Sequence, residues 1–324
     1  MIWPKVRDVL LAASFLNGKV RRTPVEMSLD MSEVTGGNVY LKWENLQFCG
    51  SFKIRGALNK IFHMSEEERK RGVVTASSGN HAQGVAVAAK MLNVKAVIFV
   101  PGVCPATKQK AIKRLGGDAV DLRVVGHLYD DAELAAMDLA KKEGLTYVSP
   151  YEDHYIVSGA GTVGLEMLLD EPDLDMIVVP AGGGGLITGI AIAAKALSPG
   201  IKIIGVQSVA SMPWVVSWQS GRVVNVCYSE TLADGLTGTI PQSLLDLART
   251  CVDDFIAVTE EEIAKAIAFL HQKHHQVVEG AGAVGVAALL SGRISALGRN
   301  VGVVISGGNI DHDVLLNVLL NNQS

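Results

Sequence analysis

Short apolar segments alternate with helix-forming segments over most of the chain, and this alternation limits the possible folds more than any other feature. Strands are expected at residues 72–75, 94–100, 120–125, 146–148, 176–179, 201–206 and 301–305. Helices are expected at residues 81–92, 105–117, 130–142, 186–197, 263–274 and 280–290. Strands joined by helices of this length form parallel sheets through right-handed crossovers. The sequence therefore predicts an α/β fold with mostly parallel sheets flanked by helices.

The length of the chain predicts two lobes. With 324 residues and roughly 150 residues per domain, about two domains are expected. No linker or low-complexity segment separates the two series of strands and helices. Two α/β lobes without a linker share a wide interface, and such interfaces commonly hold ligands.

Composition excludes several classes of protein. The chain has 29 Lys and Arg against 33 Asp and Glu, a net charge of -4, and only 5% aromatic residues. It therefore lacks the basic field that neutralises a phosphate backbone and the aromatic platforms that stack on single strands. Nucleic acid is not expected as a partner. With 48% hydrophobic and 19% charged residues, the chain is also too rich in core residues to be disordered.

No segment indicates secretion or a membrane. The four cysteines Cys49, Cys104, Cys227 and Cys251 are isolated, which fits neither a disulfide framework nor a zinc site. The apolar run at residues 9–16 is too short and too crowded by charge for a signal peptide. The long uncharged stretches at residues 176–194 and 203–221 contain glycine and proline and are interpreted as strand, loop and helix. A soluble, cytoplasmic protein is expected.

A lysine stands among apolar residues after the first glycine turn. Lys53 lies between Gly50 and Gly56 and follows Phe52 directly. Burial lowers the pKa of a lysine because it penalises the charged form, and such an amine can form a Schiff base. Spacing alone favours the competing interpretation, a surface lysine at a helix end. The choice between a surface lysine and a Schiff-base lysine depends on the other loops of the chain.

Three further loops offer groups for an anionic ligand. Residues 77–81, Ser-Ser-Gly-Asn-His, open a helix whose free N–H groups suit a carboxylate. The four glycines at 182–185 follow a buried strand and let backbone N–H groups converge on a phosphate. Ser306 follows the last strand and can bond a ring nitrogen. The plain alternatives are helix capping for the first loop and structural turns for the other two.

The glycine loop fits neither common nucleotide motif. No Gly-Lys-Ser/Thr follows it, and it lacks the spaced glycines and the later acidic residue of a dinucleotide fingerprint. A loop with four glycines and no lysine suits a phosphate monoester held by backbone amides.

Taken together, seven segments resemble those of one known family. They lie at residues 44–56, 77–84, 159–162, 182–186, 231–235, 279–282 and 306–309. In order and spacing they closely resemble the fold-type II pyridoxal-phosphate enzymes, whose fold is that of the tryptophan synthase β subunit. Within that group the chain looks like the threonine/serine dehydratases (ammonia-lyases) and the serine racemases. The resemblance implies a small domain at about 49–149 and a large domain formed by 1–48 and 150–324.

The resemblance also implies a role for each residue of the site. Lys53 would form the Schiff base with pyridoxal 5'-phosphate and act as the base, and Phe52 would pack beside the ring. Asn80 would bond the ring hydroxyl and Ser306 the ring nitrogen. The phosphate would be held by Gly182, Gly183, Gly184, Gly185 and Leu186. The substrate carboxylate would be received by Ser77, Ser78, Gly79, Asn80 and His81, and Glu279 would be structural, near the ring or capping the next helix.

The implied activity is removal of water and ammonia from L-threonine or L-serine. A neutral serine at the ring nitrogen makes the ring a weaker electron sink than a carboxylate partner would, which favours rapid elimination. The alternatives are a racemase, a dehydratase of another 3-hydroxy amino acid such as hydroxyaspartate, and a non-catalytic binding protein, against which Lys53 argues. A homo-oligomer, dimer or tetramer, is expected by resemblance. Feedback inhibition by isoleucine is not expected, because the sequence shows no C-terminal regulatory domain of the kind found in biosynthetic threonine dehydratases.

Four departures from the family pattern bear on the substrate. Ser78 occupies the position of the serine that acts as acid/base in serine racemases. The racemase-type arginine is missing from residues 126–131, and Ser158 and Ala160 replace the usual alanine and glutamine. Residues 207–213 lack the two carboxylates with which serine racemases bind a divalent ion, so no metal is expected.

Overall fold

The structure is a computed structural model and describes residues 2–322, which form ten strands and fourteen α-helices. The strands are β1 (Val25–Met27), β2 (Asn38–Trp43), β3 (Val73–Ala76), β4 (Ala96–Val100), β5 (Val120–Val124), β6 (Thr146–Tyr147), β7 (Met176–Pro180), β8 (Lys202–Ser208), β9 (Asp254–Val258) and β10 (Asn300–Ile305). The α-helices are α1 (Val6–Leu16), α2 (Leu29–Thr35), α3 (Lys53–Phe62), α4 (Glu66–Arg71), α5 (Asn80–Leu92), α6 (Ala106–Gly116), α7 (Tyr129–Glu143), α8 (His154–Asp170), α9 (Gly185–Leu197), α10 (Pro213–Ser220), α11 (Gln242–Cys251), α12 (Glu260–His274), α13 (Gly280–Leu290) and α14 (His312–Asn321). Three 3-10 turns complete the chain: η1 (Glu44–Leu46), η2 (Gly117–Ala119) and η3 (Asp234–Leu236).

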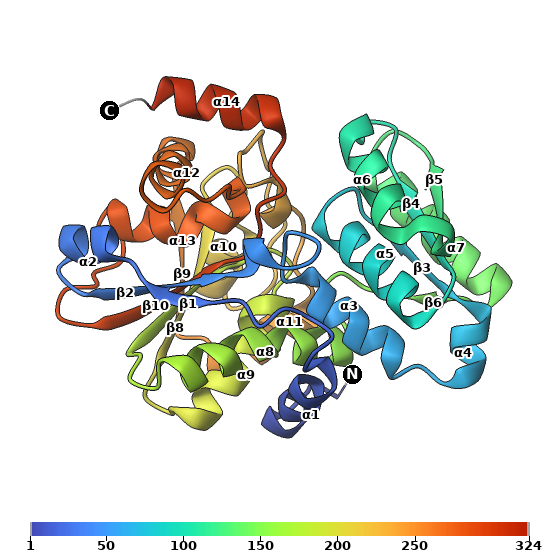
Figure 1. Cartoon of the computed structure of the whole chain (residues 1–324), viewed down its shortest axis with the longest axis horizontal. Coiled ribbons are helices and arrows are strands. Elements are labelled where there is room, and N and C mark those ends of the chain that lie inside the picture. The colour runs from blue at the N-terminus through green and yellow to red at the C-terminus, as the bar shows by residue number, and fades with distance from the viewer. Residues whose placement is uncertain (1, 323–324) are drawn as a thin grey trace.

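The strands form two separate sheets (Figure 1). The large sheet has the order β1-β2-β10-β7-β8-β9, and only the β1–β2 pair is antiparallel. The small sheet has the order β5-β4-β3-β6 and is parallel throughout. The predicted α/β fold with mostly parallel sheets is thereby confirmed.

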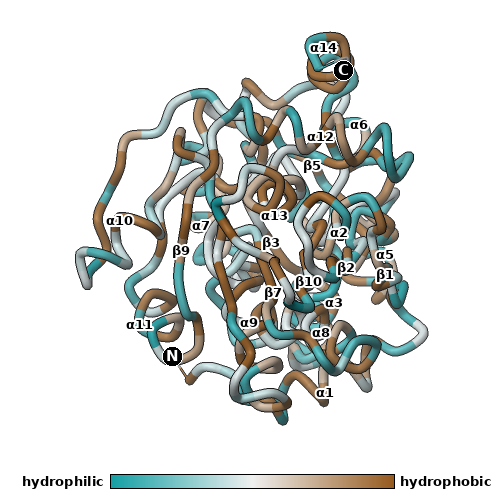
Figure 2. The backbone as a smooth tube through the Cα atoms, turned by 90° about the vertical axis from the view of Figure 1, so that its left-hand side faces the viewer, coloured by the Kyte–Doolittle hydropathy of each residue, from teal (hydrophilic) through white to brown (hydrophobic). Residues whose placement is uncertain are grey.

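Both faces of each sheet are covered by helices, as the side-chain alternation of strands requires. In the small sheet, Val73 and Ile98 pack in a cluster with α3 and α5, while Val74 and Phe99 pack against α7. In the large sheet, one face contacts α12 and α13 and the other contacts α8, α9 and α11. Figure 2 shows the hydrophobic segments gathered around β7, β10 and α13 in the interior. Among residues 2–322, no helix is long and apolar enough to cross a membrane.

The seven predicted strands and six predicted helices are all present, with ends within three residues of those expected. One detail differs: Pro105 was expected in the first turn of a helix and instead occupies the N-cap position of α6. The main elements missing from the prediction are β1, β2 and β9 in the large sheet and the long helix α8.

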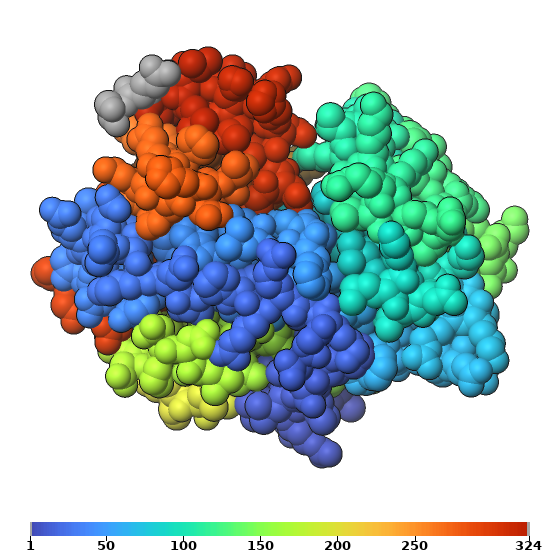
Figure 3. Space-filling view, viewed as in Figure 1, coloured from blue at the N-terminus to red at the C-terminus, as the bar shows by residue number. Residues whose placement is uncertain are grey.

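Two lobes are visible around the two sheets, with a furrow between the C-terminal segments and the segments of the small sheet (Figure 3). We propose residues 49–149 as the small domain and 1–48 with 150–322 as the described part of the large one. The arrangement of the sheets supports this division, because β1 and β2 belong to the large sheet and β3 to β6 to the small one. Helix α3 packs on α5 of the small lobe and on α8 of the large lobe.

Glycines bring the helices of the large lobe into backbone contact. A Cβ atom at Gly159 would lie 2.6 Å from the carbonyl oxygen of Arg55 on α3, and one at Gly161 would lie 2.6 Å from that of Gly189 on α9. These distances leave no room for any side chain. Helix α8 is thus locked between α3 and α9, the two helices that begin at the predicted Schiff-base lysine and at the glycine loop.

Candidate active site

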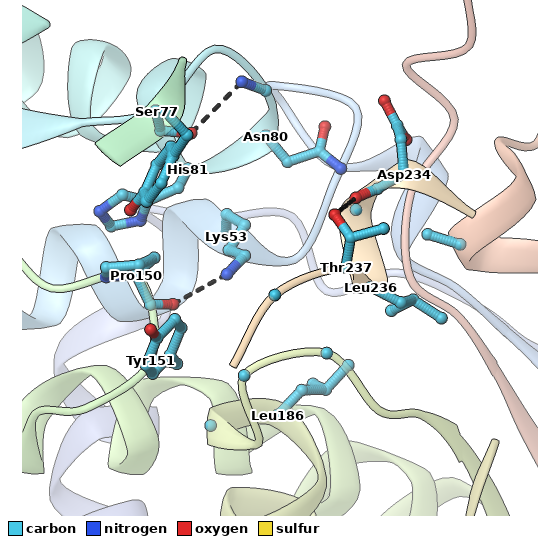
Figure 4. Close-up of a pocket in the computed structure, with 18 of the residues that line it drawn as sticks. Lys53, Ser77, Asn80, His81, Pro150, Tyr151, Leu186, Asp234, Leu236 and Thr237 are labelled. Carbon is cyan, nitrogen blue, oxygen red and sulfur yellow. Dashed lines mark hydrogen bonds between the residues drawn. The ribbon is translucent and has the colours of Figure 1, made fainter. Parts of the chain in front are cut away.

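A pocket of about 570 Å³ is lined by residues of both lobes, a volume typical of sites for small molecules. Every residue of the predicted site lines it: Phe52, Lys53, Ser77, Ser78, Gly79, Asn80, His81, Gly182, Gly183, Gly184, Gly185, Leu186 and Ser306. Segments far apart in the sequence therefore meet at one place (Figure 4). The chemical role of each residue stays a prediction.

Lys53 is the first residue of α3, and its amine points into the pocket (Figure 4). The Nζ atom donates to the carbonyl oxygen of Pro150 at 2.8 Å and lies 5.2 Å from the ring centroid of Phe52. Burial lowers the pKa of Lys53 to about 8, against the opposing charge of Glu279. A far larger share of this amine than of an ordinary lysine is therefore uncharged near neutral pH, and the uncharged form is the one that acts as nucleophile and base.

The start of α3 is attached to the last strand. The N–H of Phe52 donates to the carbonyl oxygen of Ser306 at 3.2 Å, and Ser51 pairs with Gly307 in a short bridge. Ser306 itself is buried, and its hydroxyl makes no hydrogen bond to any residue among 2–322. A free hydroxyl thus lines the pocket from the carboxyl end of β10, as the predicted contact to a ring nitrogen requires.

The glycine loop joins β7 to α9 and packs against two aromatic rings. A Cβ atom at Gly183 would lie 2.1 Å from the ring of Tyr151, and one at Gly184 would lie 2.4 Å from the ring of Trp214. Gly184 also has φ +99°, a conformation that favours glycine. The loop ends at the N-terminus of a 13-residue helix, where free N–H groups attract anions. A loop of four glycines, where side chains would clash with their neighbours, brings the backbone to the start of α9 and fits the phosphate of the predicted cofactor.

The second anion-binding loop precedes α5. The hydroxyl of Ser77 accepts from the N–H of Gly79 at 3.3 Å, and a Cβ atom at Gly79 would meet no atom within 4 Å. His81 contributes differently from its neighbours, because its side chain is buried with Nε2 3.0 Å from the carbonyl oxygen of Val148. Burial, with the charge of Lys53, lowers the pKa of His81 to about 3, so this ring is neutral. Its backbone is the part available to a substrate carboxylate.

Asn80 is held by Glu279, which was expected to be structural, near the ring or capping the next helix, and by Asn309, for which no role was predicted. Its Nδ2 donates to Glu279 at 2.6 Å, and its Oδ1 accepts from Asn309 at 2.7 Å. The second amide hydrogen of Asn80 remains for the expected ring hydroxyl. Glu279 occupies the N-cap position of α13 without a capping hydrogen bond. Burial, together with Asp234, raises the pKa of Glu279 to about 7.

The pocket contains further polar residues that no sequence signal indicated. Tyr129 and Glu133 line it from α7, and Lys108 lines it from α6. Lys108 crosses between the lobes, with its Nζ 3.2 Å from Asp234 and 3.7 Å from Asp311. Of the two departures in α8, Ala160 lines the pocket, whereas Ser158 does not and instead bonds Asn59 at 3.1 Å.

A buried network of charges anchors α3 two residues after Lys53. Arg55 makes two hydrogen bonds of 2.8 Å to Glu44 and bonds of 2.6 and 2.9 Å to Glu166. Lys42 donates to Glu166 at 2.6 Å, and Thr23 donates to Glu44. Burial alone would raise the pKa of Glu44, but the adjacent Arg55 holds it below its usual value. The network connects β2, α3 and α8.

Removal of Arg55 is expected to destabilise the protein strongly. Arg55→Met leaves the buried carboxylate of Glu44 without its charged partner and removes one of the two cationic partners of the part-buried Glu166, which costs about 3–5 kcal/mol of unfolding free energy. Urea denaturation measures the loss. The matched control is Arg293→Met, which breaks the exposed pair with Glu262 and is expected to cost about 1 kcal/mol or less. Equal losses in the two variants would contradict the anchoring role of the network.

Among residues 2–322, no three His, Cys, Asp or Glu side chains converge as a metal site needs. The expectation that this chain binds no metal stays a prediction.

The chain is similar to known proteins in sequence and in structure. The model of the pyridoxal-phosphate dependent enzyme family matches residues 16–307. The chain is 47% identical to the L-threonine ammonia-lyase of Thermotoga maritima, over 96% of this chain and 77% of that protein. It is 42% identical to the catabolic L-threonine dehydratase of Staphylococcus aureus, over 94% of this chain and 88% of that protein. The structure of maize serine racemase superimposes with a TM-score of 0.93 at 34% identity, covering 99% and 98% of the two chains.

The chain therefore belongs to the family of pyridoxal-phosphate-dependent enzymes, and pyridoxal phosphate is its cofactor. The predicted resemblance to the threonine/serine dehydratase and serine racemase group is confirmed.

Proposed function

We propose that this enzyme converts L-threonine and L-serine to the corresponding 2-oxo acid and ammonia. In this reaction the α C–H and Cβ–O bonds break and water leaves, and hydrolysis of the resulting enamine returns one water and releases ammonia. The observation that carries the proposal is one pocket that combines the Lys53 amine with two anion-binding loops, before α5 and before α9. The two relatives at 42–47% identity support the choice of substrate.

Each group of pocket residues has a separate role in the proposed reaction. When bound, pyridoxal phosphate supplies the electron sink for the charge that develops as the α-proton leaves. Lys53, with a pKa of about 8, takes that proton. The N-terminus of α5 and the hydroxyls of Ser77 and Ser78 orient the substrate carboxylate, and the glycine loop holds the phosphate. Ser306, which carries no charge, favours rapid elimination over a long-lived carbanion.

A racemase is the second candidate, and the likeness to maize serine racemase favours it. Racemisation needs a proton donor on the face opposite Lys53, and Ser78, which lines the same pocket, has a hydroxyl that can serve. Elimination from the L-enantiomer needs only Lys53 and an acid for the leaving hydroxyl. Ser78 is therefore the residue at which the two functions separate.

Ser78→Ala is expected to leave elimination from L-threonine within about tenfold of the wild type, because that reaction does not use the Ser78 proton. Any conversion of L-serine to D-serine is expected to fall by about a hundredfold or more, the usual cost of losing an acid/base group. Chiral chromatography of L-serine incubations, with pyruvate measured in parallel, reads both reactions. Wild-type formation of D-serine that outpaces pyruvate would replace the dehydratase by the racemase.

We also propose a cytoplasmic homo-oligomer, a dimer or tetramer. Support comes from large apolar side chains on the surface of the described chain, such as Leu10, Leu11 and Phe48, each at least half exposed. Where such residues form a contiguous patch, they are typical of surfaces that pair with another subunit.

A further inference from the structure

One wall of the pocket carries a carboxylate held in place by two phenols. Glu133 Oε1 accepts hydrogen bonds from Tyr147 at 3.0 Å and from Tyr129 at 3.2 Å. Burial raises the pKa of both tyrosines and the charge of Glu133 adds to this effect, so the phenols stay protonated donors. Glu133 Oε2 accepts no hydrogen bond from any residue among 2–322. An oriented carboxylate oxygen is therefore available on the lining of the pocket.

The charges around this wall are predominantly negative. Asp130, Glu133, Asp234 and Glu279 line the pocket, and the cations among its described lining residues are Lys53 and Lys108. In the proposed function, Lys53 attaches the cofactor and removes the α-proton, so it is not free to bind a substrate side chain. Lys108 is already paired with Asp234 and Asp311. Among the described residues that line the pocket, no cation is therefore left to pair with a second carboxylate on a substrate.

We propose that Glu133 makes the pocket selective for amino acids whose side chain is neutral or cationic and donates a hydrogen bond, and that it excludes acidic side chains. This inference rests on the proposed function for the position of the reacting amino acid. It names a specificity-determining residue and the substrate class: hydroxy or amino side chains are accepted, and those of aspartate and hydroxyaspartate are rejected. Like charges that meet in a partly desolvated site cost several kcal/mol, which is enough to decide between substrates.

Two features of the wall fit this selectivity. Tyr129 and Tyr147 fix Glu133 through its Oε1 atom, so the carboxylate offers Oε2 without a further loss of side-chain freedom. Ala160, which also lines the pocket, has only a methyl group and no polar group of its own to offer a substrate side chain. Among Tyr129, Glu133 and Ala160, Glu133 alone carries a charge.

The test compares L-asparagine and L-aspartate, which are close in size and differ in charge. Neither has a β-hydroxyl leaving group, so each is titrated into the holoenzyme and its binding is read from the visible absorbance of the bound cofactor. Wild type is expected to bind aspartate about a hundredfold more weakly than asparagine. Glu133→Gln is expected to reduce that ratio by about tenfold or more. Glu143→Gln, on an exposed position of the same helix, is the matched control and is expected to leave the ratio unchanged.

A wild-type enzyme that binds aspartate as tightly as asparagine would overturn the proposal, and so would a ratio that Glu133→Gln leaves within twofold of wild type. Tyr147→Phe removes one of the two phenols without touching the charge, and we expect it to keep the preference for asparagine. A loss of the preference in that variant would also count against the charge of Glu133 as its cause. Because binding is read without turnover, the outcome is separate from the proposed activity: absent deamination of threonine and serine would refute that activity alone.

Discussion

Lys53→Ala is expected to reduce deamination of L-threonine and L-serine by at least about 10⁴-fold, because one amine serves as the cofactor attachment and as the base. The fold is expected to survive, since Nζ of Lys53 makes one hydrogen bond, to the carbonyl oxygen of Pro150. Activity is measured by release of the 2-oxo acid, and the attachment by retention of the cofactor through dialysis against a competing amine.

Lys60→Ala is the matched control for this variant. Lys60 lies on the same helix, but its amine pairs with Asp153 at 2.6 Å and does not line the pocket. We expect this control to keep activity within a few-fold of wild type and to retain its cofactor. If Lys53→Ala behaved in the same way, Lys53 could not be the residue that attaches the cofactor.

Gly184→Asp is expected to weaken binding of pyridoxal phosphate by at least about a hundredfold. Three effects act together: the left-handed φ of +99°, a Cβ atom 2.4 Å from Trp214, and a negative charge added to the loop that would hold the phosphate. Equilibrium titration of the cofactor-free protein with pyridoxal phosphate measures the loss, and circular dichroism checks that the fold is kept.

Gly200→Asp makes the same substitution where a Cβ atom meets nothing within 4 Å, and it is expected to bind cofactor like the wild type. Full cofactor occupancy in the folded Gly184→Asp protein would show that the phosphate lies elsewhere.

The features that the sequence predicted well are local ones. An apolar strand followed by a glycine turn and a helix is encoded within about twenty residues, so β7, the glycine loop and α9 were expected almost as they are. Lys53 and Ser306 were expected in one site by family resemblance, and the structure brings them together through the contact between Phe52 and Ser306.

The features that the sequence did not predict depend on distant partners. Helix α8 is rich in small residues, and its glycines make sense only when α3 and α9 lie against them. The charged residues Glu44, Arg55 and Glu166 look like ordinary polar residues until the fold brings them into one network, in which Glu44 and Arg55 are buried. Glu133 stands two residues beyond the segment that lacks the racemase-type arginine, and only the fold shows that it lines the pocket, held by the phenols of Tyr129 and Tyr147.

The glycine contacts of α8 also limit which positions of this enzyme can accept substitutions in the course of evolution. Gly159 and Gly161 meet backbone atoms of neighbouring helices, so even alanine would push the helices apart and disturb Lys53 and the phosphate loop at once. Lineages of this enzyme are therefore expected to keep these glycines while their substrates diverge. Residues such as Glu133 and Ala160 line the pocket, and their exchange is expected to disturb the helices less. New substrate ranges are thus expected to arise by substitutions on the pocket wall, over an unchanged helical frame.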